Sequence, residues 1–259
     1  MAPAWVLAAI ALLALLVALP LLLGGRRQNR RLERLLQASE HRLEQLQGQF
    51  ERFVPADVVE RLTRADDAIE PERREVTMLF ADLRGFTALC DRLDPALTVR
   101  ILNDYFGHMT LAITRHHGHV TEFVGDGLLA LFGALEPDPW QARDAVMAAL
   151  EMRAELARYN DGLRAQGLPE LRFGIGIHGG EVVAGVIGTA GLSKFSVTGD
   201  PINVASRVEG LTGKFGVDLL VTEDIRRAVE PQFRMRAMPP AMVKGKAEPI
   251  QTYFVEAAE

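Results

Sequence analysis

The chain has 259 residues, enough for one domain of ordinary size and an additional segment. Its 29 basic and 34 acidic side chains give a formal net charge of −5, which does not favour a nucleic-acid partner, because such partners usually require a basic domain. The single cysteine, Cys90, excludes an internal disulfide and is typical of a reduced, cytosolic thiol.

A membrane anchor is predicted at the start of the chain. Residues 4–23 carry no charged or strongly polar side chain, and about 20 such residues cross a bilayer. The arginines that follow at 26, 27, 30 and 31 place the rest of the chain in the cytoplasm by the positive-inside rule. A cleaved secretory signal is the alternative, but the run is longer than usual for one and has no basic segment before it. We expect residues 1–25 to form a single-pass anchor in the plasma or inner membrane.

Residues 26–54 are predicted to form a coiled-coil stalk. Apolar side chains with one polar member alternate at spacings of four and three, at Leu32, Leu36, Ser39, Leu43, Leu46, Phe50 and Phe53. A regular seven-residue repeat favours a two-stranded coil over the alternative, one amphipathic helix on the membrane surface. Two chains anchored at the same end would form a parallel homodimer. Residues 55–72, which are rich in acidic residues and proline, are expected to be a linker.

The remaining residues, 73–259, are predicted to form one α+β domain. Apolar runs typical of strands occupy 75–81, 120–124, 128–132, 171–177, 181–187, 217–222, 233–237 and 252–256. Helical spacing of apolar residues occupies 95–116, 140–164 and 203–211. Gly125, Asp126 and Gly127 separate two of the strands and indicate a hairpin. This order predicts a sandwich of helices on a mixed, mainly antiparallel sheet.

Two aspartates follow apolar strand segments in this domain. Asp82 ends the strand at 75–81, and Asp126 lies at the tip of the hairpin. Either residue alone is explained by ordinary turn chemistry. If the strands are neighbours, the two carboxylates can bind two divalent cations, Mg²⁺ or Mn²⁺, which prefer oxygen ligands together with phosphates. Two cations about 4 Å apart can activate an attacking hydroxyl and stabilise a leaving oxyanion.

Four motifs resemble the class III adenylate and guanylate cyclases. Residues 80–87 (FADLRGFT) are similar to the segment that opens their catalytic domain, and residues 123–127 (FVGDG) to their second metal motif. Residues 198–207 (TGDPINVASR) resemble their transition-state motif, and residues 243–246 (VKGK) their late phosphate-binding segment. The motifs occur in the order and spacing of the family and cover nearly all of residues 73–256.

The resemblance implies the class III cyclase fold, a nucleoside triphosphate substrate and a homodimer with two active sites shared at its interface. It implies that Asp82, Leu83 and Asp126 hold two Mg²⁺ or Mn²⁺ ions. The same resemblance assigns substrate contacts to Gly85, Phe86, Thr87 and, from the other chain, to the Lys244 side chain. Asn203 and Arg207, also from the other chain, are the implied catalytic residues. Asn203 would orient the ribose, and Arg207 would offer a permanently charged fork to the α-phosphate.

Two positions bear on the base. Glu122 stands where adenylate cyclases typically carry lysine, and glutamate there resembles guanylate cyclases. A carboxylate only accepts hydrogen bonds, which suits the N1–H and N2–H₂ donors of guanine. Ser196 stands at the second base position and suits either base, because its hydroxyl can donate or accept. The pair favours GTP slightly over ATP.

One position departs from the family pattern. Gly174 stands where some members carry an arginine that binds phosphate. Arg172 lies two residues earlier, on the same face of a strand by alternation, so it could replace that arginine. A catalytically silent nucleotide-binding or dimerisation module is the alternative to an active cyclase. The presence of Asp82, Asp126, Asn203 and Arg207 favours activity.

Overall fold

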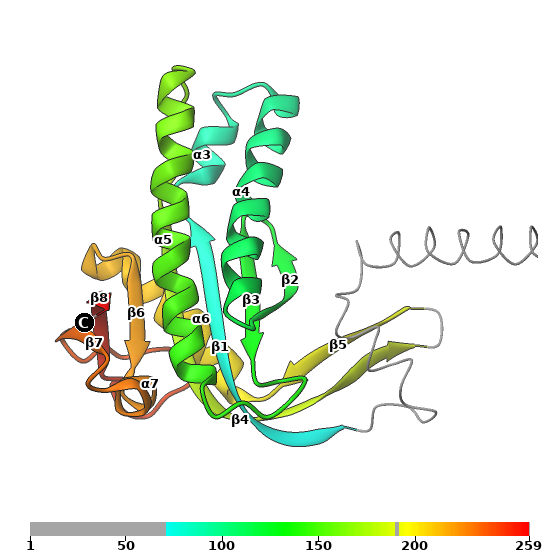
Figure 1. Ribbon diagram of the computed structural model, residues 1–259, viewed down its shortest axis with the longest axis vertical. Coiled ribbons are helices and arrows are strands. Elements are labelled where there is room, and N and C mark those ends of the chain that lie inside the picture. The colour runs from blue at the N-terminus through cyan, green and yellow to red at the C-terminus, as the bar shows by residue number, and fades with distance from the viewer. Residues whose placement is uncertain (1–70, 190–191, 259) are drawn as a thin grey trace, which may run out of the picture. The chain divides into compact units, whose positions relative to one another are not determined.

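An eight-stranded sheet organises the chain in the computed structural model, which describes residues 71–189 and 192–258 (Figure 1). The strand order is β2-β3-β1-β4-β6-β8-β7, and β5 pairs with β4. Only the β4–β6 pair is parallel among the paired strands described, which confirms the predicted mixed, mainly antiparallel sheet. The elements in chain order are β1 Glu72–Leu83, α3 Phe86–Cys90, α4 Pro95–Arg115, β2 His119–Val124, β3 Gly127–Phe132, α5 Gln141–Ala165, β4 Phe173–Thr189, β5 Leu192–Thr198, α6 Asp200–Phe215, β6 Leu219–Thr222, α7 Glu223–Val229, β7 Phe233–Ala237 and β8 Thr252–Ala258.

The predicted anchor at 1–25 and stalk at 26–54 lie outside the described residues, as does the linker at 55–72 except for its last two positions. Glu72, the last of these, already begins β1. Within residues 71–189 and 192–258, each helix is too short or too polar to cross a bilayer.

One face of the sheet is covered by α4 and α5, which lie side by side along it (Figure 1). Asp94 caps α4, because its carboxylate accepts hydrogen bonds from the N–H groups of Ala96 and Leu97. The alternate residues Leu79 and Ala81 of β1 belong to the core on this face, and each is at most 1 % exposed. Because β1 lies between β3 and β4 and is covered on both faces, its central residues 76–81 are mostly apolar.

The opposite alternate residues of β1 and β4 face α6. A Cβ atom on Gly176 would lie 2.1 Å from the backbone nitrogen of Glu209, so glycine allows the helix to touch the sheet backbone. Val204 and Val208 of α6 then pack against Leu220 and Val243 in a second apolar cluster. This close contact fixes the height of α6 above the sheet.

The structure corrects the prediction of two strands at 171–177 and 181–187. Residues 173–189 form one strand, and Gly179 and Gly180 continue its pairing with β1 instead of making a turn. A Cβ atom on Gly180 would lie 2.8 Å from Cγ of Pro201, at the start of α6. Gly180 therefore allows α6 to pack closely against the strand.

Three short elements were not predicted, namely α3, β5 and α7, and α6 is longer than the predicted 203–211. The helices α3 and α7 have 5 and 7 residues, too few to repeat a helical apolar pattern. The first turn of α6 begins with Asp200 and Pro201 and does not show a helical apolar pattern, and Pro201 suits this position because its fixed φ is already helical.

Candidate active site

The two aspartates converge at one end of the sheet. Asp82 is the penultimate residue of β1, and Asp126 lies in the turn between β2 and β3. Ala81 pairs with Leu128, so this turn lies beside the end of β1. A Cβ atom on Gly127 would lie only 2.9 Å from Oδ1 of Asp82. Glycine at this position therefore leaves the space that the Asp82 carboxylate occupies.

The electrostatics of the pair fit a divalent cation. Burial raises the pKa of Asp82, the neighbouring charge of Asp126 raises it further, and the Leu83 N–H group opposes both effects. Two carboxylates that repel one another in this way are stabilised by a hard cation between them. The side chain of Leu83 is 5 % exposed and packs in the core, so only its backbone can take the predicted part in metal binding.

The turn after β1 presents backbone to solvent. Gly85 has φ +69°, a left-handed conformation that favours glycine, and space is open where a Cβ would stand. Phe86 is 8 % exposed and anchors the turn in the core, while Thr87 is exposed. Arg84 holds the turn in place through two hydrogen bonds. Its backbone N–H donates to the Arg172 carbonyl at 2.7 Å, and its guanidinium donates to the Val217 carbonyl. The predicted phosphate contacts at 85–87 are therefore accessible as backbone groups.

A second group of predicted residues gathers around α6. Asn203 and Lys244 are exposed, and Arg207 is half-buried. Gly245, with φ +79°, lies against the Arg207 guanidinium, since a Cβ there would be 3.2 Å from Nη1. Among the described residues, this buried Nη1 has no hydrogen-bond partner. A buried cationic donor without a partner suits a ligand anion.

An ion pair holds the loop of Lys244 onto α6. Nζ of Lys246 lies 2.6 Å from Oδ2 of Asp200, the first residue of the helix, and this contact lowers the pKa of Asp200. Val243 of the same loop is buried against the α6 cluster. The residues predicted to bind ribose and phosphate thus form one supported surface.

The two groups face different directions within one chain. Asn203 and Arg207 are four residues apart and share a face of α6. Glu209 lies two residues, or about 200°, further around the helix, and its carboxylate points at β4. Arg207 therefore points away from the sheet face that carries Asp82.

The predicted base contacts lie on separate strands. Glu122 is exposed on β2, just after a break in the β2–β3 register, and Ser196 is half-buried on β5. In hydrogen-bonding order, β3, β1 and β4 separate these two strands. Strand pairing alone does not bring Glu122 beside Ser196.

The structure also places Gly174 and Arg172. A Cβ atom on Gly174 would lie 2.1 Å from Oγ1 of Thr212 and 2.5 Å from Oε1 of Glu209, so side chains of α6 fill the place of the missing arginine. Arg172 precedes β4, which begins at Phe173, so the argument from strand alternation does not apply. Its side chain lines a cavity of about 550 Å³ with Arg84 and Arg153.

Sequence reasoning missed two side chains near the aspartates. Burial, together with the charges of Asp82 and Asp126, raises the pKa of Glu209 to about 7, although Arg84 opposes the shift. Tyr105 of α4 is fully buried, and burial and the charges of Asp82, Asp126 and Glu209 raise its pKa. The position of Glu209, two residues after Arg207 in a recognised motif, was the available signal; Tyr105 reads as an ordinary core position.

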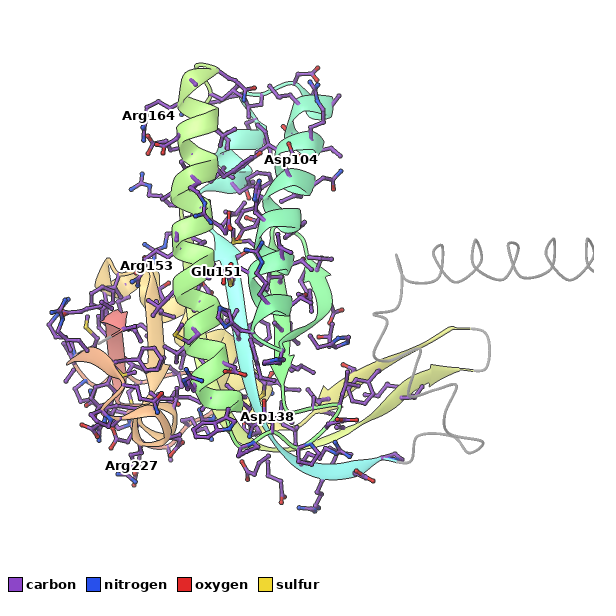
Figure 2. All side chains as sticks on the ribbon, viewed as in Figure 1. Asp104, Asp138, Glu151, Arg153, Arg164 and Arg227 are labelled. Carbon is purple, nitrogen blue, oxygen red and sulfur yellow. The ribbon has the colours of Figure 1, made fainter. Side chains whose placement is uncertain are left out.

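Another possible metal-binding group lies elsewhere. Ligand atoms of His117, Asp138 and Asp144 are within 4.8 Å of one another. Two of these residues already pair, with His117 Nδ1 2.9 Å from Asp144 Oδ2. Figure 2 shows Asp138 near the lower end of α5, below the arrowhead of β1, and Asp82 is the penultimate residue of that strand. This group is distinct from the Asp82–Asp126 pair.

Comparison with known proteins agrees with the geometry. The family described as "Adenylate and Guanylate cyclase catalytic domain" matches residues 69–257. An adenylate cyclase of Anabaena cylindrica is 37% identical over 235 residues, which cover 86% of this chain and 45% of that protein. Adenylate cyclase 1 of Rhizobium meliloti is 32% identical, covering 71% of this chain and 28% of that protein. The chain thus spans less than half the length of these relatives.

Two solved structures are similar. The guanylyl cyclase Cya2 is 34% identical with a TM-score of 0.69, covering 73% of this chain and 95% of that one. The adenylyl cyclase CyaB of P. aeruginosa is 26% identical with a TM-score of 0.69, covering 73% and 97%. The neighbours include enzymes named for each purine base.

Proposed function

This chain belongs to the class III adenylate and guanylate cyclase family, and we propose that it converts a purine nucleoside triphosphate into its 3′,5′-cyclic monophosphate and pyrophosphate. The observation that carries the proposal is the convergence of Asp82 and Asp126 at neighbouring strand ends, beside an accessible turn at 85–87. In this reaction the ribose 3′-oxygen bonds to the α-phosphorus, the bond from that phosphorus to the β-phosphate oxygen breaks, and the hydroxyl proton leaves to solvent.

The proposed roles follow from the chemistry of each group. Asp82, Asp126 and the Leu83 backbone would hold two Mg²⁺ or Mn²⁺ ions. Such ions supply charge that favours ionisation of the hydroxyl and stabilises the leaving pyrophosphate. Backbone N–H groups at 85–87 would donate to phosphate oxygens, assisted by Lys244. Asn203 would orient the ribose, and Arg207 would stabilise charge at the α-phosphate through its fork of donors.

The proposed enzyme is a homodimer with two shared sites. Arg207 points away from the sheet face that carries Asp82 of its own chain. A second copy related by two-fold symmetry can bring its Asn203, Arg207 and Lys244 to the aspartates of the first, and the reverse contact forms the second site. The predicted parallel stalk at 26–54 would hold the two copies at the same end.

GTP is the proposed preferred substrate, with ATP as the alternative. The proposal rests on Glu122, whose carboxylate accepts hydrogen bonds and so complements the guanine donors. Ser196 suits both bases. The relatives named above include cyclases of both kinds, so they favour neither base.

A cyclisation assay tests the proposal. Purified full-length chain with Mn²⁺ should release cyclic nucleotide and pyrophosphate in equal amounts, from GTP faster than from ATP. Asp82→Asn serves as the inactive control. The alternative, a silent nucleotide-binding module, predicts triphosphate binding without cyclic product from either nucleotide. Product equal in the wild type and in Asp82→Asn would also contradict the proposed site.

We also propose that residues 1–25 tether the catalytic domain to the cytoplasmic side of the membrane. Support comes from the uncharged run at 4–23 and the arginines that follow it. The chain expressed in bacteria should sediment with membranes and resist extraction with high salt. Recovery of the intact chain in the soluble fraction would contradict the anchor. Cleavage of residues 1–25 from the expressed chain would also contradict it.

A further inference from the structure

The metal-binding end of the sheet contains a third carboxylate, that of Glu209. Asp82 pairs directly with Gly174 on β4, and residues opposite one another in an antiparallel pair project on the same face. Oε1 of Glu209 fills the place of a side chain at Gly174, since a Cβ there would be 2.5 Å away. The Glu209 carboxylate therefore lies on the same face of the sheet as Asp82, beside Gly174, the residue on β4 that pairs with Asp82.

The Glu209 position is imposed by tight packing. The backbone of Glu209 would be 2.1 Å from a Cβ on Gly176, and Val208 beside it is fully buried. An exposed acidic side chain could turn into water, but the backbone of this residue is clamped against β4. Its charge is consequently held near Asp82 and Asp126, and the charges of these two residues contribute to the raised pKa of Glu209.

A buried hydroxyl on α4 is subject to the charges of the same three carboxylates. Tyr105 is fully buried, and within the described part of the chain its hydroxyl has no hydrogen-bond partner. The charges that act on it are those of Asp82, Asp126 and Glu209. An unpaired buried hydroxyl costs about 1–3 kcal/mol, so its retention needs a compensating role.

We propose that Glu209 and Tyr105 are positioning residues of the metal centre, which supply a third negative charge and a hydroxyl group behind Asp82 and Asp126. The inference rests on the proposed metal role of those two aspartates. Neither residue needs to touch the cations, because partners behind the direct ligands set the orientation and charge of a metal site and typically change metal affinity about 10- to 100-fold.

Metal binding without substrate tests the proposal. Full-length protein at pH 8 is titrated with Mn²⁺ alone, and free Mn²⁺ is measured by electron paramagnetic resonance. Glu209→Gln should raise the dissociation constant about tenfold, and Tyr105→Phe should raise it a few-fold. Glu155→Gln is the matched control, because Glu155 is also a buried carboxylate, 8 % exposed, but pairs with Arg158 on α5. This control should bind Mn²⁺ like the wild type.

Thermal unfolding of the metal-free protein separates positioning from a structural role. Tyr105→Phe removes an unpaired hydroxyl, so the metal-free variant should unfold no lower than the wild type. Mn²⁺ should then raise its unfolding temperature less than that of the wild type. A variant that loses metal-free stability but binds Mn²⁺ normally would have a structural role only, and this result would overturn the proposal.

Asp82→Asn separates the proposed metal role of the aspartates from the proposed positioning role of Glu209 and Tyr105. If Asp82→Asn binds Mn²⁺ as the wild type does, the proposed metal role of the aspartates fails. If Asp82→Asn loses binding while Glu209→Gln and Tyr105→Phe both bind within twofold of the wild type, the aspartates are the metal ligands and the positioning proposal alone is wrong.

Discussion

Asp82 and Gly127 lie so close across the end of the β1–β3 pair that one added methyl group would meet the carboxylate. A Cβ on Gly127 would be 2.9 Å from Oδ1 of Asp82 and 3.0 Å from the Ala81 carbonyl oxygen. The carboxylate is the end of a side chain that can rotate, whereas the carbonyl belongs to a buried strand. The glycine therefore controls where one proposed metal ligand can stand.

Gly127→Ala should weaken metal activation while leaving the fold intact. The methyl group displaces the Asp82 carboxylate, and we expect the Mn²⁺ concentration for half-maximal cyclisation to rise about tenfold. Gly162→Ala is the matched control, because Gly162 is exposed on α5 with open space around its Cβ position. That change should stabilise the helix by up to about 1 kcal/mol and leave metal activation unchanged. Equal metal activation in both variants would refute the steric argument.

Exchange of the proposed base-reading residue should shift substrate preference. In Glu122→Lys, lysine would present donors to the donors of guanine, and an unmatched buried polar group costs about 1–3 kcal/mol. The ratio of kcat/KM for GTP to that for ATP should fall on the order of tenfold to a hundredfold. Ser196→Asp in the same chain should lower it further, because a carboxylate accepts from adenine N6. A wild-type preference for ATP, or an unchanged ratio in Glu122→Lys, would remove Glu122 from the base site.

Stability of the metal-free protein should depend on Glu209 and pH. The folded protein raises the pKa of Glu209 from 4.5 to about 7, so it binds this proton more tightly than the unfolded chain does. The stabilisation of the folded state by protonated Glu209 is complete below about pH 4.5 and is lost as the pH rises through about 7. Glu209→Gln mimics the protonated form, so its stability should match that of the wild type at pH 5. At pH 8 it should unfold roughly 5 °C higher, which corresponds to a gain of about 2 kcal/mol in the free energy of unfolding.

Calorimetry in the presence of a chelator tests whether Glu209→Gln raises the unfolding temperature at pH 8. Glu155→Gln, which removes a carboxylate engaged with Arg158, should instead unfold below the wild type at pH 8. A Glu209→Gln protein that is less stable than the wild type at pH 8 would show that the ionised carboxylate makes a favourable contact in the metal-free state.

Much of this architecture was predictable because its signals are local. The run at 75–81 is mostly apolar and the run at 128–132 is apolar throughout because β1 and β3 are covered on both faces, and α4 and α5 are long enough to repeat a helical pattern. The single strand β4 was missed because Gly179-Gly180 reads as a turn. The positions of Ile225 and Pro201, both distant in sequence, explain the glycines at 179 and 180.

The residues of the candidate site were likewise predictable only where their signals are local in sequence. Asp82, Asp126, Asn203 and Arg207 were recognisable because each belongs to a motif of consecutive residues. Glu209 depends on a contact between α6 and Gly174, and Tyr105 on burial beneath residues far away in sequence. Strand alternation does not apply to Arg172, because β4 begins one residue later, at Phe173.

The central claim is that each chain carries two half-sites that only a second chain completes, and complementation measures it most directly. Asp82→Ala lacks a proposed metal ligand, and Arg207→Ala lacks the proposed α-phosphate contact, so each homodimer should be inactive. Mixed chains form heterodimers in which one of the two sites has every residue. Co-expressed with different tags and purified through both, the heterodimer should recover up to about half of the wild-type cyclisation rate per dimer. A doubly purified heterodimer no more active than its parents would contradict the divided site.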